Sequence, residues 1–147
     1  MATLHYNILI IGDDGSGKAT YLNRILRYTD LNIIDLDTSY GLIRFHIVLK
    51  GQADGALLFF DLTTSKSVEG LKGWKLGFSL ENPGAPLVIC GSKCDIPIQD
   101  RMFSHTSVLQ LVQGYKFFYI SSKTGFQIYE PLVALARSLT GKADLYI

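Results

Sequence analysis

The chain has 147 residues, of which 48% are hydrophobic, enough for one domain of ordinary size with its own core. Its 14 basic and 13 acidic residues give a net charge of +1 with no long run of one sign, which excludes the charged surface typical of nucleic-acid or anionic-membrane binders. The two cysteines are too few for a disulfide-rich secreted domain, so we expect an intracellular protein.

The apolar stretches are too short to cross a membrane, since none reaches about 18 residues. The N-terminal apolar run lacks a basic leader, and the final residues, TGKADLYI, contain no cysteine to prenylate. We therefore expect neither a signal peptide nor a membrane partner.

The first half of the chain predicts a strand, a helix and a hairpin. The run YNILII at 6–11 stops at a glycine and predicts a strand, and the apolar spacing over 18–28 predicts a helix. Residues 31–49 are rich in β-branched and aromatic side chains on both sides of Ser39-Tyr40-Gly41, which predicts two strands joined by a turn.

The second half alternates strands and helices. The continuous apolar runs at 55–62 and 86–91 are typical of parallel strands buried on both faces, and 115–120 predicts a last strand. Helices are predicted over 68–80, 104–113 and 130–139. Trp74 is expected to pack in the core, and Cys90 to be buried on the strand 86–91. The order β-α-β-β-β-α-β-α-β-α predicts an α/β three-layer fold around a mainly parallel sheet.

Residues 12–20 read GDDGSGKAT and match the phosphate-binding loop (P-loop) pattern GxxxxGK. The motif follows a predicted strand and opens a predicted helix, so its backbone N–H groups can cradle phosphate while Lys18 reaches the terminal phosphates. An ordinary glycine-rich turn is the alternative. The predicted phosphate-side residues are Asp13, Asp14, Gly15, Ser16, Gly17, Lys18, Ala19 and Thr20.

The residue after the P-loop lysine is Ala19, where the motif normally carries a Ser or Thr hydroxyl that binds Mg²⁺. Thr20 lies about 100° further round the predicted helix and is a poor substitute. The pattern therefore predicts poor Mg²⁺ binding, and we assign no metal ligand.

Two more motifs follow later predicted strands: ICGSKCD at 89–95 and YISSKTG at 119–125. With the P-loop, they make the chain resemble the small GTPases of the Ras superfamily over almost its whole length. The similarity is strongest to the Ran subfamily, which serves nucleocytoplasmic transport, and lies in 59–63, 86–96 and 113–147. The resemblance implies one reduced G domain over 1–147, GTP or GDP as ligand, Ran-type transport or regulatory partners, and a location in the cytoplasm, the nucleus or both.

The resemblance also assigns the residues that contact guanine. Asp95 would accept hydrogen bonds from the guanine ring N–H and exocyclic amine, and the stem of Lys93 would lie over the base. Ser92 stands where the family usually has Asn. Its shorter side chain would make only part of the bracing hydrogen bonds that the Asn amide makes. The backbone N–H of Ser122 would meet the guanine O6. The implied set is Ser92, Lys93, Asp95, Ser121, Ser122 and Lys123.

The metal-side motif DxxG, its catalytic glutamine and the switch II helix are missing from the sequence. The predicted strand LIRFHIVL at 42–49 is followed by KGQADG and then by the next strand. Gln52 is the nearby candidate for the glutamine, with a polar loop residue as the alternative reading. Thr29 and Thr38 are candidates for the switch I threonine, or else turn or strand residues.

The short link after 49 also poses a geometric problem, since a parallel crossover normally needs about a dozen residues. Six residues span at most about 20 Å. We expect the third strand to end early, with 47–55 as the return path; a strand that changes direction or place is the alternative.

Asp14 stands where most family members carry glycine beside the γ-phosphate, and a carboxylate there repels phosphate. We therefore expect a pseudoGTPase, which binds guanine nucleotide with weak or absent hydrolysis and acts as a constitutive binder or decoy of small-GTPase partners. Two alternatives stay open: a scaffold that binds no nucleotide, and a working GTPase with metal ligands rebuilt from Asp35, Asp37 or Asp61.

Overall fold

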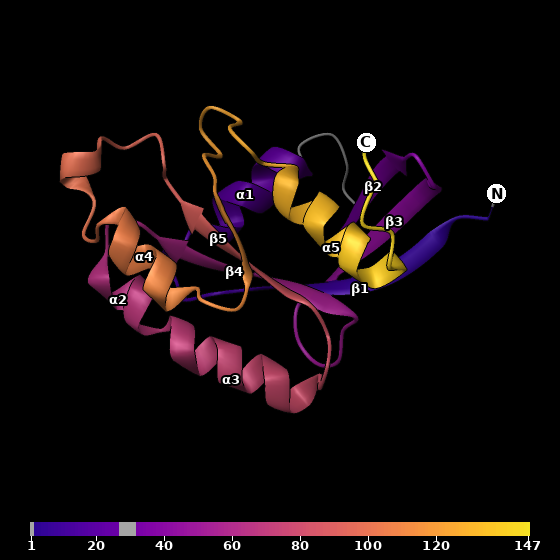
Figure 1. The fold of residues 1–147 in the computed structure, drawn as a ribbon, viewed down its shortest axis with the longest axis horizontal. Coiled ribbons are helices and arrows are strands. Elements are labelled where there is room, and N and C mark those ends of the chain that lie inside the picture. Colours follow the sequence, from indigo (N-terminus) through magenta and orange to yellow (C-terminus); the bar gives the residue numbers. More distant parts are fainter. Residues whose placement is uncertain (1, 27–31) are drawn as a thin grey trace.

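The computed structural model describes residues 2–26 and 32–147, and its element order follows the prediction (Figure 1). In chain order the elements are β1 (Leu4–Ile11), α1 (Lys18–Ile25), β2 (Ile33–Thr38), β3 (Gly41–Val48), β4 (Gly55–Asp61), α2 (Ser65–Glu69), α3 (Leu71–Glu81), β5 (Leu87–Ser92), a 3-10 turn (Ile98–Asp100), α4 (His105–Leu111), β6 (Lys116–Tyr119) and α5 (Glu130–Thr140). The helix predicted over 68–80 is two helices, with Gly70 between them. The helix predicted over 18–28 ends at Ile25, although 27 and 28 lie outside the described residues.

The six strands form one sheet in the order β2-β3-β1-β4-β5-β6. β2 is antiparallel to β3, and the other neighbouring pairs are parallel, as predicted. The parallel strands β1 and β5 run toward the left of Figure 1, so the loops after them meet at that edge of the sheet. This edge is where ligands bind in open α/β sheets.

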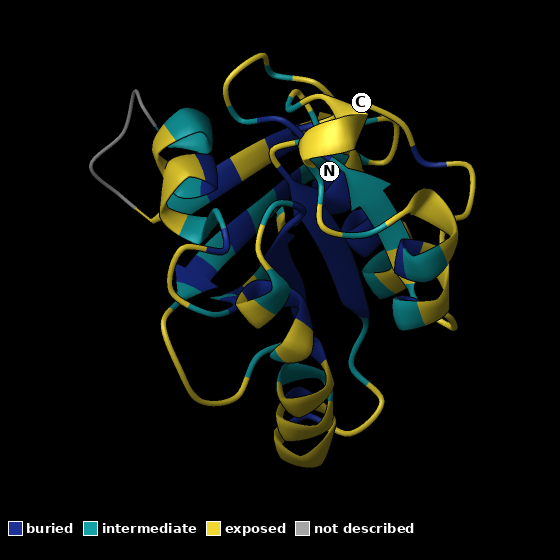
Figure 2. Ribbon diagram, turned by 90° about the vertical axis from the view of Figure 1, so that its left-hand side faces the viewer, coloured by how far each residue is buried: buried dark blue, intermediate teal, exposed yellow. Residues whose placement is uncertain are grey.

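Helices cover both faces of the sheet, which gives the predicted three layers. One apolar cluster joins α1 and α5 to the sheet, and a second joins α2, α3 and α4 to the opposite face. Figure 2 shows the buried strands at the centre with the exposed sides of the helices outside them. Every residue of β4 and β5 is buried, as the continuous apolar runs predicted.

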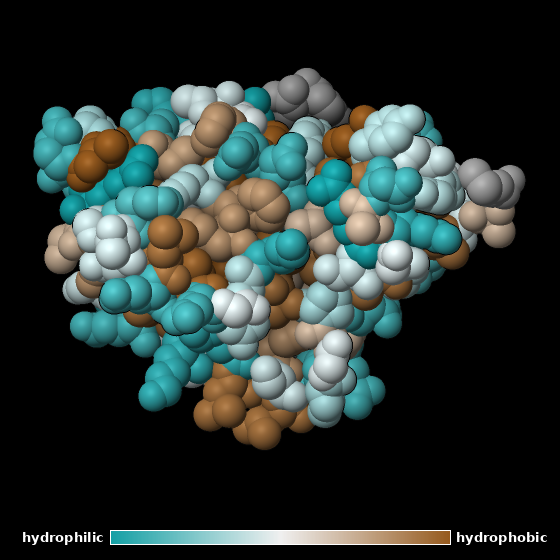
Figure 3. Space-filling model, in the orientation of Figure 1, coloured by the Kyte–Doolittle hydropathy of each residue, from teal (hydrophilic) through white to brown (hydrophobic). Residues whose placement is uncertain are grey.

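Part of α3 remains apolar at the surface. In the space-filling view, apolar atoms gather at the lower edge of the molecule, over α3 (Figure 3). The exposed apolar side chains of this helix are Leu76 and Leu80. Within residues 2–26 and 32–147, no helix has the length and apolar character needed to cross a membrane.

The third strand does not end early, so this prediction was wrong. β3 pairs with β1 as far as Val48, which lies opposite Leu9, while β4 begins opposite Ile8 with Gly55. The end of β3 and the start of β4 are therefore almost level along β1. The link 49–54 has only to pass across β1, about 10 Å between the two flanking strands, and six residues reach that far without a helix.

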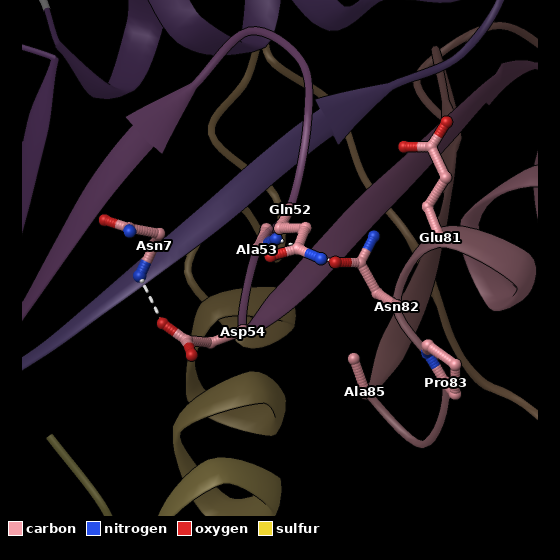
Figure 4. Close-up of a pocket in the computed structure, with 8 residues that line it drawn as sticks. All are labelled: Asn7, Gln52, Ala53, Asp54, Glu81, Asn82, Pro83 and Ala85. Carbon is pink, nitrogen blue, oxygen red and sulfur yellow. Dashed lines mark hydrogen bonds between the residues drawn. The ribbon is translucent and has the colours of Figure 1, made fainter.

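The link is fixed where it meets β1, in the pocket drawn in Figure 4. The Asp54 N–H donates to Asn7 O, and the Asn7 N–H donates to Asp54 Oδ2, both at 2.7 Å. The Ala53 N–H donates to Asn82 Oδ1 at 2.8 Å. Gln52 lines the same pocket, at the amino end of β4, whereas the P-loop follows the carboxyl end of β1.

Candidate nucleotide site

The P-loop packs so closely against its neighbours that two of its glycines are required. Gly12 and Gly17 have φ values of +146° and +102°, a range that L side chains rarely adopt. A Cβ atom at Gly12 would lie 2.5 Å from Phe59 O, and one at Gly17 would lie 2.7 Å from Ser92 Oγ. The loop is therefore seated directly on the ends of β4 and β5.

Lys18 closes the loop from its other end. Lys18 is the first residue of α1, and its side chain runs back across the loop. Its Nζ donates a hydrogen bond to Gly12 O at 2.5 Å. Within the loop, the Ser16 N–H donates to Asp13 O at 3.0 Å. Asp14 and Ala19 are exposed. The ammonium group thus lies within the loop, and the loop leads directly into the amino end of α1. A positive charge and N–H groups at the start of a helix favour phosphate binding.

Ser92 braces the P-loop in spite of its short side chain. It is buried, and its Oγ lies 2.7 Å from Ser16 O and 3.0 Å from Phe60 O. A hydroxyl has one hydrogen to donate, so the two carbonyls share it. The expected loss of bracing at this position is therefore only partial, since the link from β5 to the P-loop remains.

The three motifs meet around one pocket of about 340 Å³ at the carboxyl edge of the sheet. It has the size of a small-molecule site. The lining residues are Gly17, Thr20, Ser92, Lys93, Asp95, Ile96, Ser122 and Lys123. Thr20 thus lies beside the predicted guanine residues.

Asp95 is held in place by its neighbour on the next loop. Ser121 is fully buried, and its Oγ donates to Asp95 Oδ1 at 2.8 Å. Asp95 itself is exposed in the pocket wall, and a carboxylate has further lone pairs to offer. The arrangement is suited to accepting hydrogen bonds from a ligand with adjacent N–H donors.

Lys93 is anchored by an ion pair that sequence reasoning missed. Its Nζ lies 2.7 Å from Asp61 Oδ2 at the end of β4, where only 1% of the Asp61 side chain is exposed. The backbone N–H and the hydroxyl of Thr63 donate to Asp61 Oδ1 at 2.8 and 2.6 Å. The stem of Lys93 therefore lies along the pocket wall with its charge fixed.

Comparison with known proteins gives the family. Residues 29–141 match the Ras family. The chain is also 33% identical over 171 residues to the GTP-binding nuclear protein GSP1 of Encephalitozoon cuniculi, an alignment that covers 97% of this chain and 79% of the relative. The chain belongs to the Ras family. It is a Ran-like member of that superfamily, as the motifs indicated.

This Ras-family chain is shorter than its relative within the matched region. The alignment spans 171 residues, whereas the whole chain has 147, so at least 24 aligned positions (171 less 147) have no counterpart here. The family match begins at 29, after the P-loop. The assignment of the P-loop therefore rests on its own motif and geometry.

Of the two switch I candidates in this Ras-family chain, the structure describes Thr38, which does not lie near the P-loop. Thr38 is the last residue of β2, and its hydroxyl donates to Gly41 O at 2.6 Å, level with the amino end of β1. Thr29 lies outside the described residues. Asp35 forms an ion pair with Arg44 at 2.8 Å on the face of the sheet.

The proposed replacement metal ligands do not form a cluster either. Asp35 and Asp37 lie on the edge strand β2, and Asp61 lies at the end of β4, with β3 and β1 between them. In the part of the chain that the structure describes, no group of three or more His, Cys, Asp or Glu side chains is placed to hold a metal ion.

The Asp61–Lys93 pair predicts a loss of stability in acid. Burial by itself raises the pKa of the Asp61 carboxyl, but hydrogen bonds from Lys93 and Thr63 outweigh it and hold the pKa below its ordinary value of 3.8. Because the pKa of Asp61 is lower in the folded chain than in the unfolded chain, the ionised carboxylate stabilises the fold. This stabilisation is complete above the pKa of the unfolded chain and is lost as the pH falls through the pKa of the folded chain.

We expect the free energy of unfolding of the wild type to fall as the pH drops below the ordinary carboxyl value of 3.8, and to fall less in Asp61→Asn. Urea unfolding at several pH values measures this dependence. Asp35→Asn is the control, because the exposed pair with Arg44 contributes less. Identical pH dependence in Asp61→Asn and the wild type would contradict the assignment.

A second prediction concerns the link between α1 and the loop after β6. Tyr21 is fully buried in α1, and its hydroxyl donates to Ile128 O at 2.7 Å. Tyr21→Phe leaves that carbonyl without its donor, and we expect a loss of about 1–3 kcal/mol in the free energy of unfolding. Urea unfolding tests it, with Tyr146→Phe at an exposed position as the control. A loss below about 0.3 kcal/mol would mean that the buried hydrogen bond contributes little.

Proposed function

We propose that residues 1–147 form a single reduced G domain that binds guanine nucleotide, hydrolyses it weakly or not at all, and does not depend on Mg²⁺. The observation that carries the proposal is the pocket in which Lys93, Asp95 and Ser122 lie beside the P-loop. The N–H donors of guanine would pair with Asp95, and the stem of Lys93 would cover the base. Lys18 and the loop N–H groups would hold the phosphates.

In the part of the chain that the structure describes, the residues beside the P-loop lysine do not fit a bound Mg²⁺ ion. The position after Lys18 offers only the methyl group of Ala19, which has no oxygen to donate to a metal. The nearby Asp61 carboxylate is already occupied by Lys93 and Thr63. We therefore propose that Lys18 and the backbone N–H groups of the loop hold the phosphates without a metal ion.

Weak hydrolysis follows from what surrounds the phosphate side of the loop. Gln52 lines a separate pocket at the amino end of β4, and we assign it no catalytic role. Asp14 adds a negative charge at the position beside the γ-phosphate. Two like charges about 4 Å apart repel by roughly 4 kcal/mol at an effective dielectric constant of 20. The site is therefore better suited to a diphosphate than to turnover of a triphosphate.

A G domain without γ-phosphate-dependent switch loops has no second state for partners to recognise. We propose that this protein is a constitutive binder or decoy of Ran-type transport or regulatory proteins, in the cytoplasm, the nucleus or both. Support comes from its similarity to a GTP-binding nuclear protein.

Thermal unfolding of nucleotide-stripped protein with GDP or ADP, together with a phosphate-release assay on GTP, tests the proposal. GDP at 100 times its dissociation constant adds about 2.7 kcal/mol to the stability, and we expect ADP to add much less. Phosphate release from GTP should be at or only slightly above the blank without protein. No shift with either nucleotide would support the scaffold alternative, and Lys18-dependent phosphate release would support a working GTPase.

A further inference from the structure

Trp74 connects α3 to the P-loop across a sequence separation of 61 residues. Its indole Nε1–H donates to Asp13 Oδ1 at 2.8 Å. The same ring lies under the P-loop lysine, with Lys18 Nζ 5.9 Å from the ring centroid, within the range of a cation–π contact. The indole therefore interacts with one acidic side chain of the loop, Asp13, and with its basic side chain, Lys18.

The start of α3 is shaped to receive the Asp13 carboxylate. A Cβ atom at Gly70 would lie 2.8 Å from Asp13 Cγ and closer still to Oδ2, so the carboxylate occupies the space that a side chain would fill. Gly70 has a φ of −70°, which any residue adopts, so the requirement for glycine here is one of space. Gly73 and Gly77, further along the same helix, have nothing within 4 Å of a Cβ atom.

This contact restrains the part of the P-loop that faces phosphate. Asp13 O accepts the Ser16 N–H, so fixing Asp13 fixes the turn that presents the N–H groups of 14–18. The hydrogen bond from Trp74 also holds a negative side chain toward α3, and so away from the position that phosphate would occupy. Without that bond, Asp13 is free to repel the ligand.

We propose that Asp13, Gly70 and Trp74 form a latch that positions the P-loop for the β-phosphate of a guanosine diphosphate, with Trp74 as a positioning residue. The inference rests on the proposed function and deepens it. The link 49–54 between β3 and β4 contains no helix that could pack against the P-loop. On the side of the P-loop that faces this link, the supporting helix is α3. Trp74 also walls a hollow of about 320 Å³ beside Leu9, Gly51 and Phe78, next to that link.

Three variants separate the latch from general effects on folding. Trp74→Phe keeps an aromatic ring but removes the N–H donor, and Gly70→Ala displaces the Asp13 carboxylate while keeping both partners. Gly73→Ala is the matched control, because the added methyl group meets nothing. Each variant is titrated calorimetrically with GDP and with GMP, which lacks the β-phosphate, and its unfolding free energy is measured separately.

We expect Trp74→Phe and Gly70→Ala to weaken GDP binding roughly 10-fold, as for a lost hydrogen bond to a charged group, and GMP binding less than about 3-fold. Gly73→Ala should bind both as the wild type does. Asp13→Asn, which keeps an acceptor oxygen, should retain most of the GDP affinity. Trp74 is the single tryptophan of the chain, so GDP should change the fluorescence of the wild type more than GMP does.

The outcomes distinguish the two claims. If the wild type binds GDP and both latch variants bind it equally well, the latch is overturned while the proposed function stands. Equal losses for GDP and GMP would also overturn it, because they would show a general structural effect. If the wild type binds no GDP, the proposed function fails and the latch fails with it.

Discussion

Lys18→Ala is expected to lower the affinity for GDP by about 100-fold, because charge-assisted hydrogen bonds to phosphate contribute about 1.5–3 kcal/mol each. Lys18 Nζ lies within the P-loop, 2.5 Å from Gly12 O. It is therefore placed to share its remaining N–H groups with phosphate oxygens. If Mg²⁺ does not bind, no metal compensates for the lost charge.

Calorimetric titration with GDP measures the effect of Lys18→Ala. Lys116→Ala is the matched control, since this exposed lysine on β6 removes the same charge away from the nucleotide pocket. Without nucleotide, Lys18→Ala should cost only about 0.5–1.5 kcal/mol of stability, the usual contribution of one hydrogen bond. An affinity within 3-fold of the wild type would mean that the P-loop does not hold phosphate.

Asp95→Ala is expected to remove the preference for guanine. In the proposed complex, its carboxylate accepts from two guanine N–H groups, and truncation leaves both without a partner. A site built to hydrogen-bond a ligand discriminates strongly through such groups. We expect GDP affinity to fall by roughly 100-fold, while the weak affinity for ADP stays unchanged.

The control for Asp95→Ala is Asp100→Ala, an exposed carboxylate in the nearby 3-10 turn. Removing Asp95 also leaves the Ser121 hydroxyl without its acceptor, so the unfolding free energy of each variant is measured alongside. Should Asp95→Ala still prefer GDP over ADP as the wild type does, the pocket recognises the base through other groups.

Local patterns in the sequence predicted most of the fold. Continuous apolar runs gave the buried strands β4 and β5, and the motifs could be placed because each follows a strand. Parallel strands bring such loops to one edge, which is why the pocket lined by Gly17, Asp95 and Ser122 could be anticipated. The nucleotide contacts assigned to these residues remain predictions.

The features that the sequence did not predict depend on distant pairs. The path of the link 49–54 follows from the register of β3 and β4 along β1. Register depends on how two strands pair, so the sequence of one strand alone does not predict it. The contact between Asp13 and Trp74 joins residues 61 positions apart, so the pattern around Trp74 indicated only packing. The Asp61–Lys93 pair was missed for the same reason.

The measurement that tests the central claim most directly is calorimetric titration of nucleotide-stripped protein with GDP, once in Mg²⁺ and once in EDTA. We predict one GDP site with affinities that agree within about 3-fold, since Ala19 replaces the hydroxyl that would bind Mg²⁺ and, within 2–26 and 32–147, no group of three or more His, Cys, Asp or Glu side chains is placed to hold a metal. An affinity that falls 100-fold or more in EDTA would contradict the account, as would the absence of any binding heat under both conditions.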